Sequence, residues 1–300
     1  MIRLDKQFLF GKFKGIFEVY CKEENPLHFV LKKMLEKELI DGIIGTTHDE
    51  KSLKAKLFTN SNNLELSSIS FNGGQISLLK KAIQKYRLKK IAVVAPSCIL
   101  DGLNKTQYYG IGCNWVKTAI ALKIGILCLG VATEESLKYE VLDIAQKKSK
   151  VRRSYVAEEG FILETVEGTK IKVDMETHHH YVNSACKYCL NLSARGSDIT
   201  YVPLEDKKRA IFIIRSERGW RTLSIVQKAF SQKLQFKFLN YSDIKYLEDL
   251  LKKKVILNID SILERVDIGL PAPKWNNNRF RKFYRIWNSI NEINIEEEVF

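Results

Sequence analysis

Apolar and polar residues follow two periodicities along the first 230 residues of the chain. Asn25 and Pro26 precede apolar residues at helical spacing, which predicts an amphipathic helix over residues 25–39 with Asn25 as its cap. The other predicted helices cover residues 75–86, 134–147 and 222–230. Short apolar runs, of the kind buried on both faces of a parallel sheet, lie at residues 43–45, 91–95, 124–129 and 210–214. Strands that alternate with helices of this length indicate an α/β fold.

Two features modify this alternation. Residues 161–166 and 169–173 flank a Glu-Gly pair like the arms of a hairpin, so the sheet is mixed or carries an antiparallel insertion. Farther on, residues 269–273 predict a linker and residues 279–287 a basic-aromatic helix, which packs its aromatic side inward or contacts a partner. We therefore predict an α/β fold with a mixed, mostly parallel sheet flanked by helices, and a C-terminal helical extension.

Composition is that of an ordinary globular protein. The 300 residues are 45% hydrophobic and 28% charged, which supplies a core and argues against a disordered or fibrous chain. The sequence contains no run of about 18 apolar residues, so we expect no membrane-spanning helix. The N-terminus lacks the apolar core of a secretory signal, and we expect a cytoplasmic protein.

The chain is strongly basic, with 49 Lys and Arg against 35 Asp and Glu and a net charge of +14. Such a charge attracts polyanions, phosphate-bearing cofactors or acidic electron-carrier proteins, although solvated surface lysines alone would also produce it. Nucleic acid is a weaker expectation, because the sequence has no RNP-type aromatic motif, helix-turn-helix pattern or basic low-complexity arm.

The cysteines carry the sharpest chemical signal. Six in 300 residues are too few for a disulfide scaffold. The Cys186–Cys189 pair has CxxC spacing, so both thiolates can reach one metal or cluster from a single turn; a zinc half-site and a redox dithiol remain alternatives. Cys98 lies just past the end of the strand predicted over residues 91–95, and Cys128 lies at the end of the strand over residues 124–127; ligands gather beyond such strand ends in α/β sheets.

Four thiolates could therefore meet at one centre, either zinc or an iron–sulfur cluster by ligand chemistry alone. The alternative is that Cys98 and Cys128 are small buried apolar residues. Cys21 and Cys113 show no partner pattern. The three histidines at 178–180 suggest zinc, but three adjacent imidazoles cannot all face one site, and we predict a polar loop there.

Five stretches, in order, resemble the beta subunit of coenzyme F420-reducing hydrogenase and its relatives, which include formate dehydrogenase beta subunits and other flavin-dependent iron–sulfur reductases. The similarity runs from about residue 20 to residue 230. The matching stretches are residues 39–44, 93–105 (VVAPSCILDGLNK), 124–128 (IGILC), 186–199 (CKYCLNLSARGSDI) and 213–219 (IIRSERG).

The resemblance implies FAD beside one 4Fe-4S cluster, and electron transfer between a hydride carrier such as a deazaflavin and one-electron centres. By match of motif, the cluster ligands are Cys98, Cys128, Cys186 and Cys189, called the cysteine set below. Positive partners for an anionic flavin would be Lys105 and Arg215, and the Gly73-Gly74 pair before a predicted helix could receive a phosphate.

The chain also departs from the family pattern. Where the family has a Ser-Gly-Gly type loop, residues 21–27 read CKEENPL. The alternative function is therefore a degenerate, non-catalytic relative that keeps a structural metal or cluster and binds partners. We predict three segments: 1–88 as an N-terminal family-like segment, 89–232 as the cluster and flavin domain, and 233–300 as a basic extension.

Overall fold

The computed structural model describes residues 6–48, 52–62, 64–71, 73–109, 114–116 and 118–270. These residues form one eight-stranded sheet, in the order β11-β1-β10-β9-β5-β4-β2-β3, and one three-stranded sheet, β6-β7-β8. The strands of the large sheet are β1 (Gly15–Cys21), β2 (Gly42–His48), β3 (Leu53–Phe58), β4 (Ile91–Pro96), β5 (Ile120–Ile126), β9 (Ile199–Pro203), β10 (Arg209–Ile214) and β11 (Leu234–Phe238).

The predicted mixed α/β sheet is confirmed, with its parallel part in the centre. Strands β2, β4, β5 and β9 are parallel neighbours. At the edges the pairing is antiparallel: β3 lies against β2, and β10, β1 and β11 follow β9. The carboxyl ends of the central strands β4 and β5 therefore point the same way. The segments that follow these two strands start side by side, at the same end of the strands.

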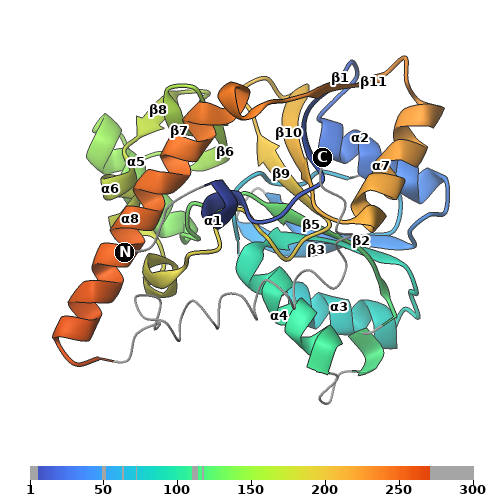
Figure 1. The fold of residues 1–300 in the computed structure, drawn as a ribbon, viewed down its shortest axis with the longest axis horizontal. Coiled ribbons are helices and arrows are strands. Elements are labelled where there is room, and N and C mark those ends of the chain that lie inside the picture. The colour runs from blue at the N-terminus through green and yellow to red at the C-terminus, as the bar shows by residue number, and fades with distance from the viewer. Residues whose placement is uncertain are drawn as a thin grey trace.

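Helices cover both faces of this sheet (Figure 1). They are α2 (Pro26–Glu36) and α7 (Glu217–Ala229) on one face, and α3 (Gln75–Gln84) and α4 (Ser97–Tyr109) on the other. Strand β4 alternates between them, because Ala92 and Val94 pack with the α2/α7 core while Ile91 and Val93 pack with the α3/α4 core. Burial on both faces explains why β4 reads as a continuous apolar run.

The hairpin predicted around residues 161–173 is confirmed, but it belongs to the separate small sheet. This sheet consists of β6 (Val151–Ala157), β7 (Gly160–Thr165) and β8 (Lys170–Val173), all antiparallel. It shares a core with four helices: α1 (Lys6–Phe10), α5 (Glu134–Ala145), α6 (Met175–Tyr181) and α8 (Lys245–Asp267). The small sheet and these helices lie beside the large sheet (Figure 1).

Several predicted boundaries move for local reasons. Asn25 caps α2 as predicted, accepting from the Leu27 and His28 N–H groups, but the helix ends at Glu36. Helix α7 begins at Glu217 rather than at residue 222, because Ser216 accepts the Gly219 N–H and so caps it earlier.

The described part of the C-terminal extension contains the 23-residue helix α8, as predicted. The linker prediction lies mostly, and the basic-aromatic helix at 279–287 entirely, outside the described residues. Within the described ranges, no helix is both long enough and apolar enough to cross a bilayer.

Candidate functional site

The cysteine set comes from three chain segments. Cys98 lies in the first turn of α4, directly after β4, and Cys128 lies two residues beyond the end of β5. Cys186 is on the short 3-10 turn η2 (Ser184–Tyr188), and Cys189 follows that turn. Cys128 is buried, Cys186 and Cys189 are half-buried, and Cys98 is exposed.

These four thiols share one electrostatic neighbourhood. Each of the six pairs within the cysteine set interacts through charge. The described residues contain no group of three or more His, Cys, Asp or Glu side chains already arranged to hold a metal ion. The fold thus brings the thiols near one another without placing their sulfur atoms in ligating geometry, and a common metal centre stays a prediction.

The donor set fits a positively charged inorganic centre. Burial raises the pKa of Cys128 to about 12 and that of Cys189 to about 11, and the charges of the neighbouring thiols push in the same direction. Burial, followed by the charge on Cys186, also raises the pKa of Cys98. Thiols with pKa values this high ionise only when a cation lies nearby. Metal binding here would therefore be coupled to proton release.

Hydrogen bonds fix the CxxC turn against the loop after β5. The Asn183 N–H donates to the Val131 carbonyl (2.8 Å), and the Cys186 N–H donates back to the Asn183 carbonyl (2.8 Å). The Val131 N–H points at the Cys186 Sγ, at 3.4 Å. These contacts hold the CxxC turn against the backbone of the loop that follows Cys128.

Helix α8 also holds the CxxC turn in place, a contact that the sequence did not predict. Asn258 Nδ2 donates to the Cys186 carbonyl (3.1 Å) and the Cys189 carbonyl (2.5 Å). Arg265 lies over the Tyr188 ring, 5.0 Å from its centroid. Asn258 and Arg265 are seven residues apart on one helix face, a spacing that could have signalled a shared target.

The three histidines correct a prediction. They lie on helix α6, capped by Asp174, and not in a polar loop. His178 and His179 are buried and face different partners: His178 Nδ1 contacts Glu140 Oε1 (2.8 Å), and His179 Nε2 contacts Ser261 Oγ (2.8 Å). The expectation that adjacent imidazoles do not face one site is confirmed, because consecutive helical positions point about 100° apart.

A second network joins α4 to the segment after the CxxC turn. Ser97 Oγ donates to the Asn191 carbonyl (2.5 Å), and Asn191 Nδ2 donates to Asp101 Oδ2 (2.6 Å). Burial raises the pKa of Asp101 to about 6, although this hydrogen bond and the charge of Arg195 oppose the rise. The charge on Asp101 acts in turn on Cys98 and Cys189.

The residues predicted to contact a flavin come from three places in the fold: helix α4, the turn before α3, and the segment after β10. Lys105 is exposed on α4, and its charge acts on Asp101. Gly74 is the N-cap of α3 and has a φ of 80°, which favours glycine whatever the ligand; the Gly73 N–H is satisfied by Gln75 Oε1 (2.8 Å).

Arg215 is placed differently from its predicted role. Its side chain is fully buried. Its donors reach three backbone carbonyls and one hydroxyl, those of Phe10, Lys12, Ser193 and Thr200. A guanidinium whose hydrogen bonds are made inside the protein ties α1 to the sheet, and it is poorly suited to hold a flavin phosphate.

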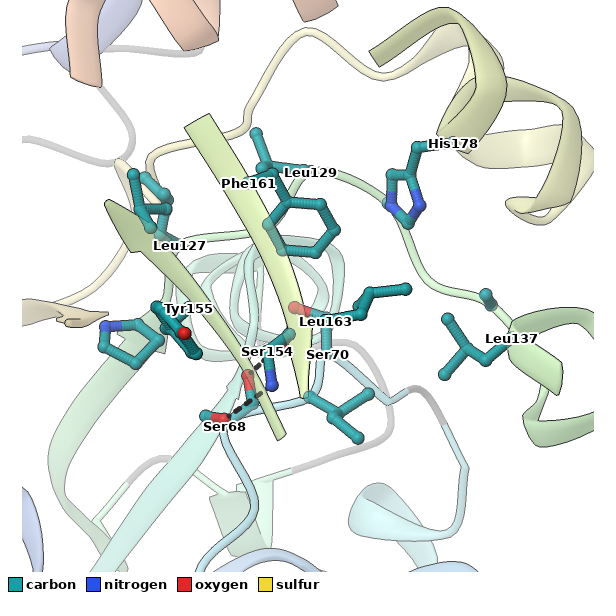
Figure 2. Close-up of a pocket in the computed structure, with 15 residues that line it drawn as sticks. Ser68, Ser70, Leu127, Leu129, Leu137, Ser154, Tyr155, Phe161, Leu163 and His178 are labelled. Carbon is teal, nitrogen blue, oxygen red and sulfur yellow. Dashed lines mark hydrogen bonds between the residues drawn. The ribbon is translucent and has the colours of Figure 1, made fainter. Parts of the chain in front are cut away.

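A small cavity lies next to Cys128, between the large sheet and the small sheet. Figure 2 shows Ser68, Ser70 and Ser154 at one side of it and His178 beside Phe161 at another. Its volume is about 30 Å³, which is space for about two water molecules and far too little for a flavin ring system. His178 Nε2 is buried at its wall without a hydrogen-bond partner among the described residues, so an ordered water there would satisfy it.

Comparison with known proteins gives a consistent result. Residues 88–236 match the family model that describes the C terminus of the beta subunit of coenzyme F420 hydrogenase/dehydrogenase. The coenzyme F420 hydrogenase subunit beta of Methanococcus voltae is 26% identical over 250 residues, which cover 80% of this chain and 87% of that protein. The subunit of the same name from Methanosarcina barkeri is 25% identical over 252 residues, which cover 79% of this chain and 83% of that protein.

A solved structure shows a similar fold. It is a chain of the xenon-derivatised F420-reducing NiFe hydrogenase complex from Methanosarcina barkeri, with a TM-score of 0.75 and 22% sequence identity. The superposition covers 91% of the present chain and 99% of that chain. The fold of most of this chain therefore occurs in a solved protein.

Proposed function

Because this chain belongs to the coenzyme F420 hydrogenase/dehydrogenase beta-subunit family, we propose that it is an oxidoreductase subunit that passes electrons between a hydride carrier and one-electron centres. The observation that carries this proposal is the placement of the cysteine set: Cys98 and Cys128 follow the carboxyl ends of β4 and β5, and the CxxC turn is hydrogen-bonded to Val131 in the loop after β5. Four thiols brought together from three distant segments are the donor set that an iron–sulfur cluster takes from a protein.

In this proposal the cysteine set holds one 4Fe-4S cluster. When bound, the cluster accepts and releases electrons one at a time. The CxxC turn and the Cys128 loop form the fixed wall of the site, held by the Val131 and Asn183 hydrogen bonds. Cys98, in the first turn of α4, is exposed and is the fourth candidate ligand.

The proposal extends to FAD and to a deazaflavin of the F420 type as the hydride carrier. Lys105 and the Gly73-Gly74 turn remain the candidates for the anionic parts of these molecules, whereas Arg215 is already used by the fold. The net charge of +14 favours an acidic redox partner protein, because opposite charges speed encounter.

Metal analysis of anaerobically purified protein tests the proposal. We expect roughly four irons per chain and a broad absorbance at about 400 nm. Cys186→Ser should lose both, while Cys113→Ser, at a cysteine outside the matched motifs and outside the described residues, should keep both. A wild-type chain without iron, or a Cys186→Ser variant with unchanged iron, would refute the cluster; fluorescence of the denatured extract decides FAD separately.

A second candidate function is a non-catalytic relative that binds partners around a structural metal. The observation that favours it is the segment before α2, where the family glycine loop is replaced. Asn25 caps α2 here, and its Nδ2 also donates to the Tyr201 hydroxyl (2.8 Å), so side chains occupy the position of the glycine loop. A colourless protein with one zinc and no flavin would favour this second function.

A further inference from the structure

Helix α8 carries a second apolar face, which is exposed among the described residues. Its first face is buried in the core that it shares with the small sheet. The second face, called the outer row below, has apolar residues at alternating spacings of three and four: Ile256, Ile259, Leu263, Val266 and Leu270. Ile259 is half-buried, and the other four are between 37% and 47% exposed. A surface helix usually has one apolar stripe, so a second one marks a contact surface.

The chain turns away from the axis of α8 at the end of the outer row. Gly269 has a φ of 73°, and its N–H donates to the Val266 carbonyl (3.0 Å). The Leu270 N–H donates to the Arg265 carbonyl (2.9 Å), which completes the Schellman pattern that ends a helix. Pro271 comes next and cannot continue a helix. The residues that follow are thus free to run back beside α8.

The sequence beyond Leu270 contains a segment whose pattern matches the outer row. Residues 279–287 are predicted as a basic-aromatic helix, and the same apolar spacing continues to residue 290; all lie outside the described residues. In residues 279–290, called the tail segment below, apolar side chains recur at spacings of three and four: Phe280, Phe283, Trp287 and Ile290. A helix of that length spans about 18 Å, and the outer row spans about 21 Å. The two rows therefore agree in spacing and nearly in length.

The connection between the two rows favours one direction. Residues 271–278 separate Leu270 from the tail segment, a length typical of connections between helices in bundles. A connection this short places consecutive helices side by side and antiparallel. Because the tail segment is tethered, it needs a smaller contact area than a separate partner would need.

The charges of the two rows are complementary only in this antiparallel direction. Three exposed carboxylates, which form no ion pair with any described residue, lie beside the C-terminal half of the outer row: Asp260, Glu264 and Asp267. The antiparallel tail segment would bring four basic residues to them: Arg279, Arg281, Lys282 and Arg285. At the other end of the row, Lys252 and Lys253 would approach the acidic residues 296–298. A parallel arrangement would set basic residues against basic residues.

We propose that the tail segment docks as an antiparallel helix on the outer row of α8 in its own chain. A second copy of the chain is a poorer occupant, because copies with a net charge of +14 repel one another. An anionic membrane would attract the basic side chains but would leave the outer row uncovered. The docked segment braces α8, whose Asn258 holds the CxxC turn, and it does so without a bound metal.

Limited trypsin digestion of the full chain tests the docking, because the four basic residues of the tail segment are trypsin sites. Every protein carries Lys274→Gln, so that a cut in the connection does not release the segment. We expect slow cleavage at these sites in the parent protein and about tenfold faster cleavage in Leu263→Asp, since a carboxylate in an apolar contact raises the undocked population. Val266→Asp should have the same effect. Ile225→Asp, at an exposed residue of α7, should leave the rate unchanged.

A charge variant tests the direction of docking. Glu264→Lys together with Asp267→Lys places basic residues beside the basic start of the tail segment. We expect this double variant to be cleaved faster than the parent protein, but less fast than Leu263→Asp. A rate equal to that of the parent protein would overturn the antiparallel arrangement.

Three further results would overturn the proposal. The first is equal cleavage rates in the parent protein, Leu263→Asp and Val266→Asp. The second is protection that grows with protein concentration, which would identify a second copy as the occupant. The third is protection that requires phosphatidylserine vesicles, which would identify a membrane surface. Circular dichroism separates release of the segment from unfolding, and if Leu263→Asp unfolds, the more exposed Val266→Asp decides.

Discussion

His28 is a residue whose protonation the fold opposes. It lies on α2, and its Nε2 is 3.2 Å from both the Leu66 backbone nitrogen and the Leu66 carbonyl oxygen. Burial lowers its pKa below the ordinary value of about 6.5. Above that value the folded and unfolded chains are both neutral at this position, and below it the unfolded chain takes up a proton first. His28 therefore costs stability as the pH falls.

We predict that His28→Gln reduces the loss of stability between pH 7.5 and pH 5. Urea unfolding of wild type and variant at both pH values measures the effect. Glutamine keeps an acceptor for the Leu66 N–H without a titrating group. Equal losses of unfolding free energy in the two proteins would show that His28 does not contribute to acid sensitivity.

Arg215 and Lys254 show where residue-level prediction from sequence ends. Arg215 follows a strand that was predicted correctly, but nothing in the sequence says that its side chain turns inward to three carbonyls. Lys254 looks like one of many lysines in a run of three, and only the packing of α8 buries it. The type of residue at a position can be read from the sequence, whereas the direction of a long side chain depends on tertiary contacts.

At the scale of elements, one glycine in α7 and one in α4 lead to opposite predictions for the effect of an alanine substitution on stability. A Cβ at Gly219, in the first turn of α7, would lie 2.4 Å from the Asp198 carbonyl oxygen. A Cβ at Gly102, inside α4, would meet nothing within 4 Å. We expect Gly219→Ala to lower the unfolding free energy by about 1–3 kcal/mol through forced separation of α7 from β9.

Gly102→Ala should instead raise the unfolding free energy by about 0.5–1 kcal/mol, because alanine restricts the unfolded chain and favours the helix. Urea titration of both variants against wild type measures the pair. A neutral Gly219→Ala would mean that α7 can move away from β9 without loss of packing.

Elements with a clear periodicity were predictable, and those defined by long-range contacts were not. Strand β4 and helices α2, α3 and α5 fall where the apolar pattern put them. Strand β6 and helix α6 were missed, because short segments carry too little periodicity to be assigned. Helix α8 was expected only as an extension, yet it shares one core with the small sheet and touches the CxxC turn.

At the scale of the whole molecule, the candidate site joins parts of the chain that sequence reasoning separated. The predicted segments end at residues 88 and 232, and this division stays a prediction. The site takes Cys98 and Cys128 from the carboxyl ends of two central strands and Cys186 from the turn after the small sheet, and Asn258 of α8 holds that turn. The position of Cys98 and Cys128 beyond strand ends was predictable from α/β topology, but the contribution of α8 was not.

This arrangement leads to a prediction about global stability. If one cluster binds thiols on both sides of the junction between the two sheets, removing the iron leaves buried thiols that repel one another when ionised. We expect chelation under oxidising conditions to lower the unfolding temperature, at roughly 2–4 °C for each kcal/mol lost. Circular dichroism before and after chelation measures it.

Cys186→Ser supplies the control, because a chain that binds no cluster should show the same unfolding temperature with and without the chelator. Cys113→Ser should respond like wild type. Iron that leaves the wild-type protein without any change in its unfolding temperature would mean that the metal is held at the surface. The four thiols would then not join the large sheet, the CxxC turn and α8 into one cooperative unit.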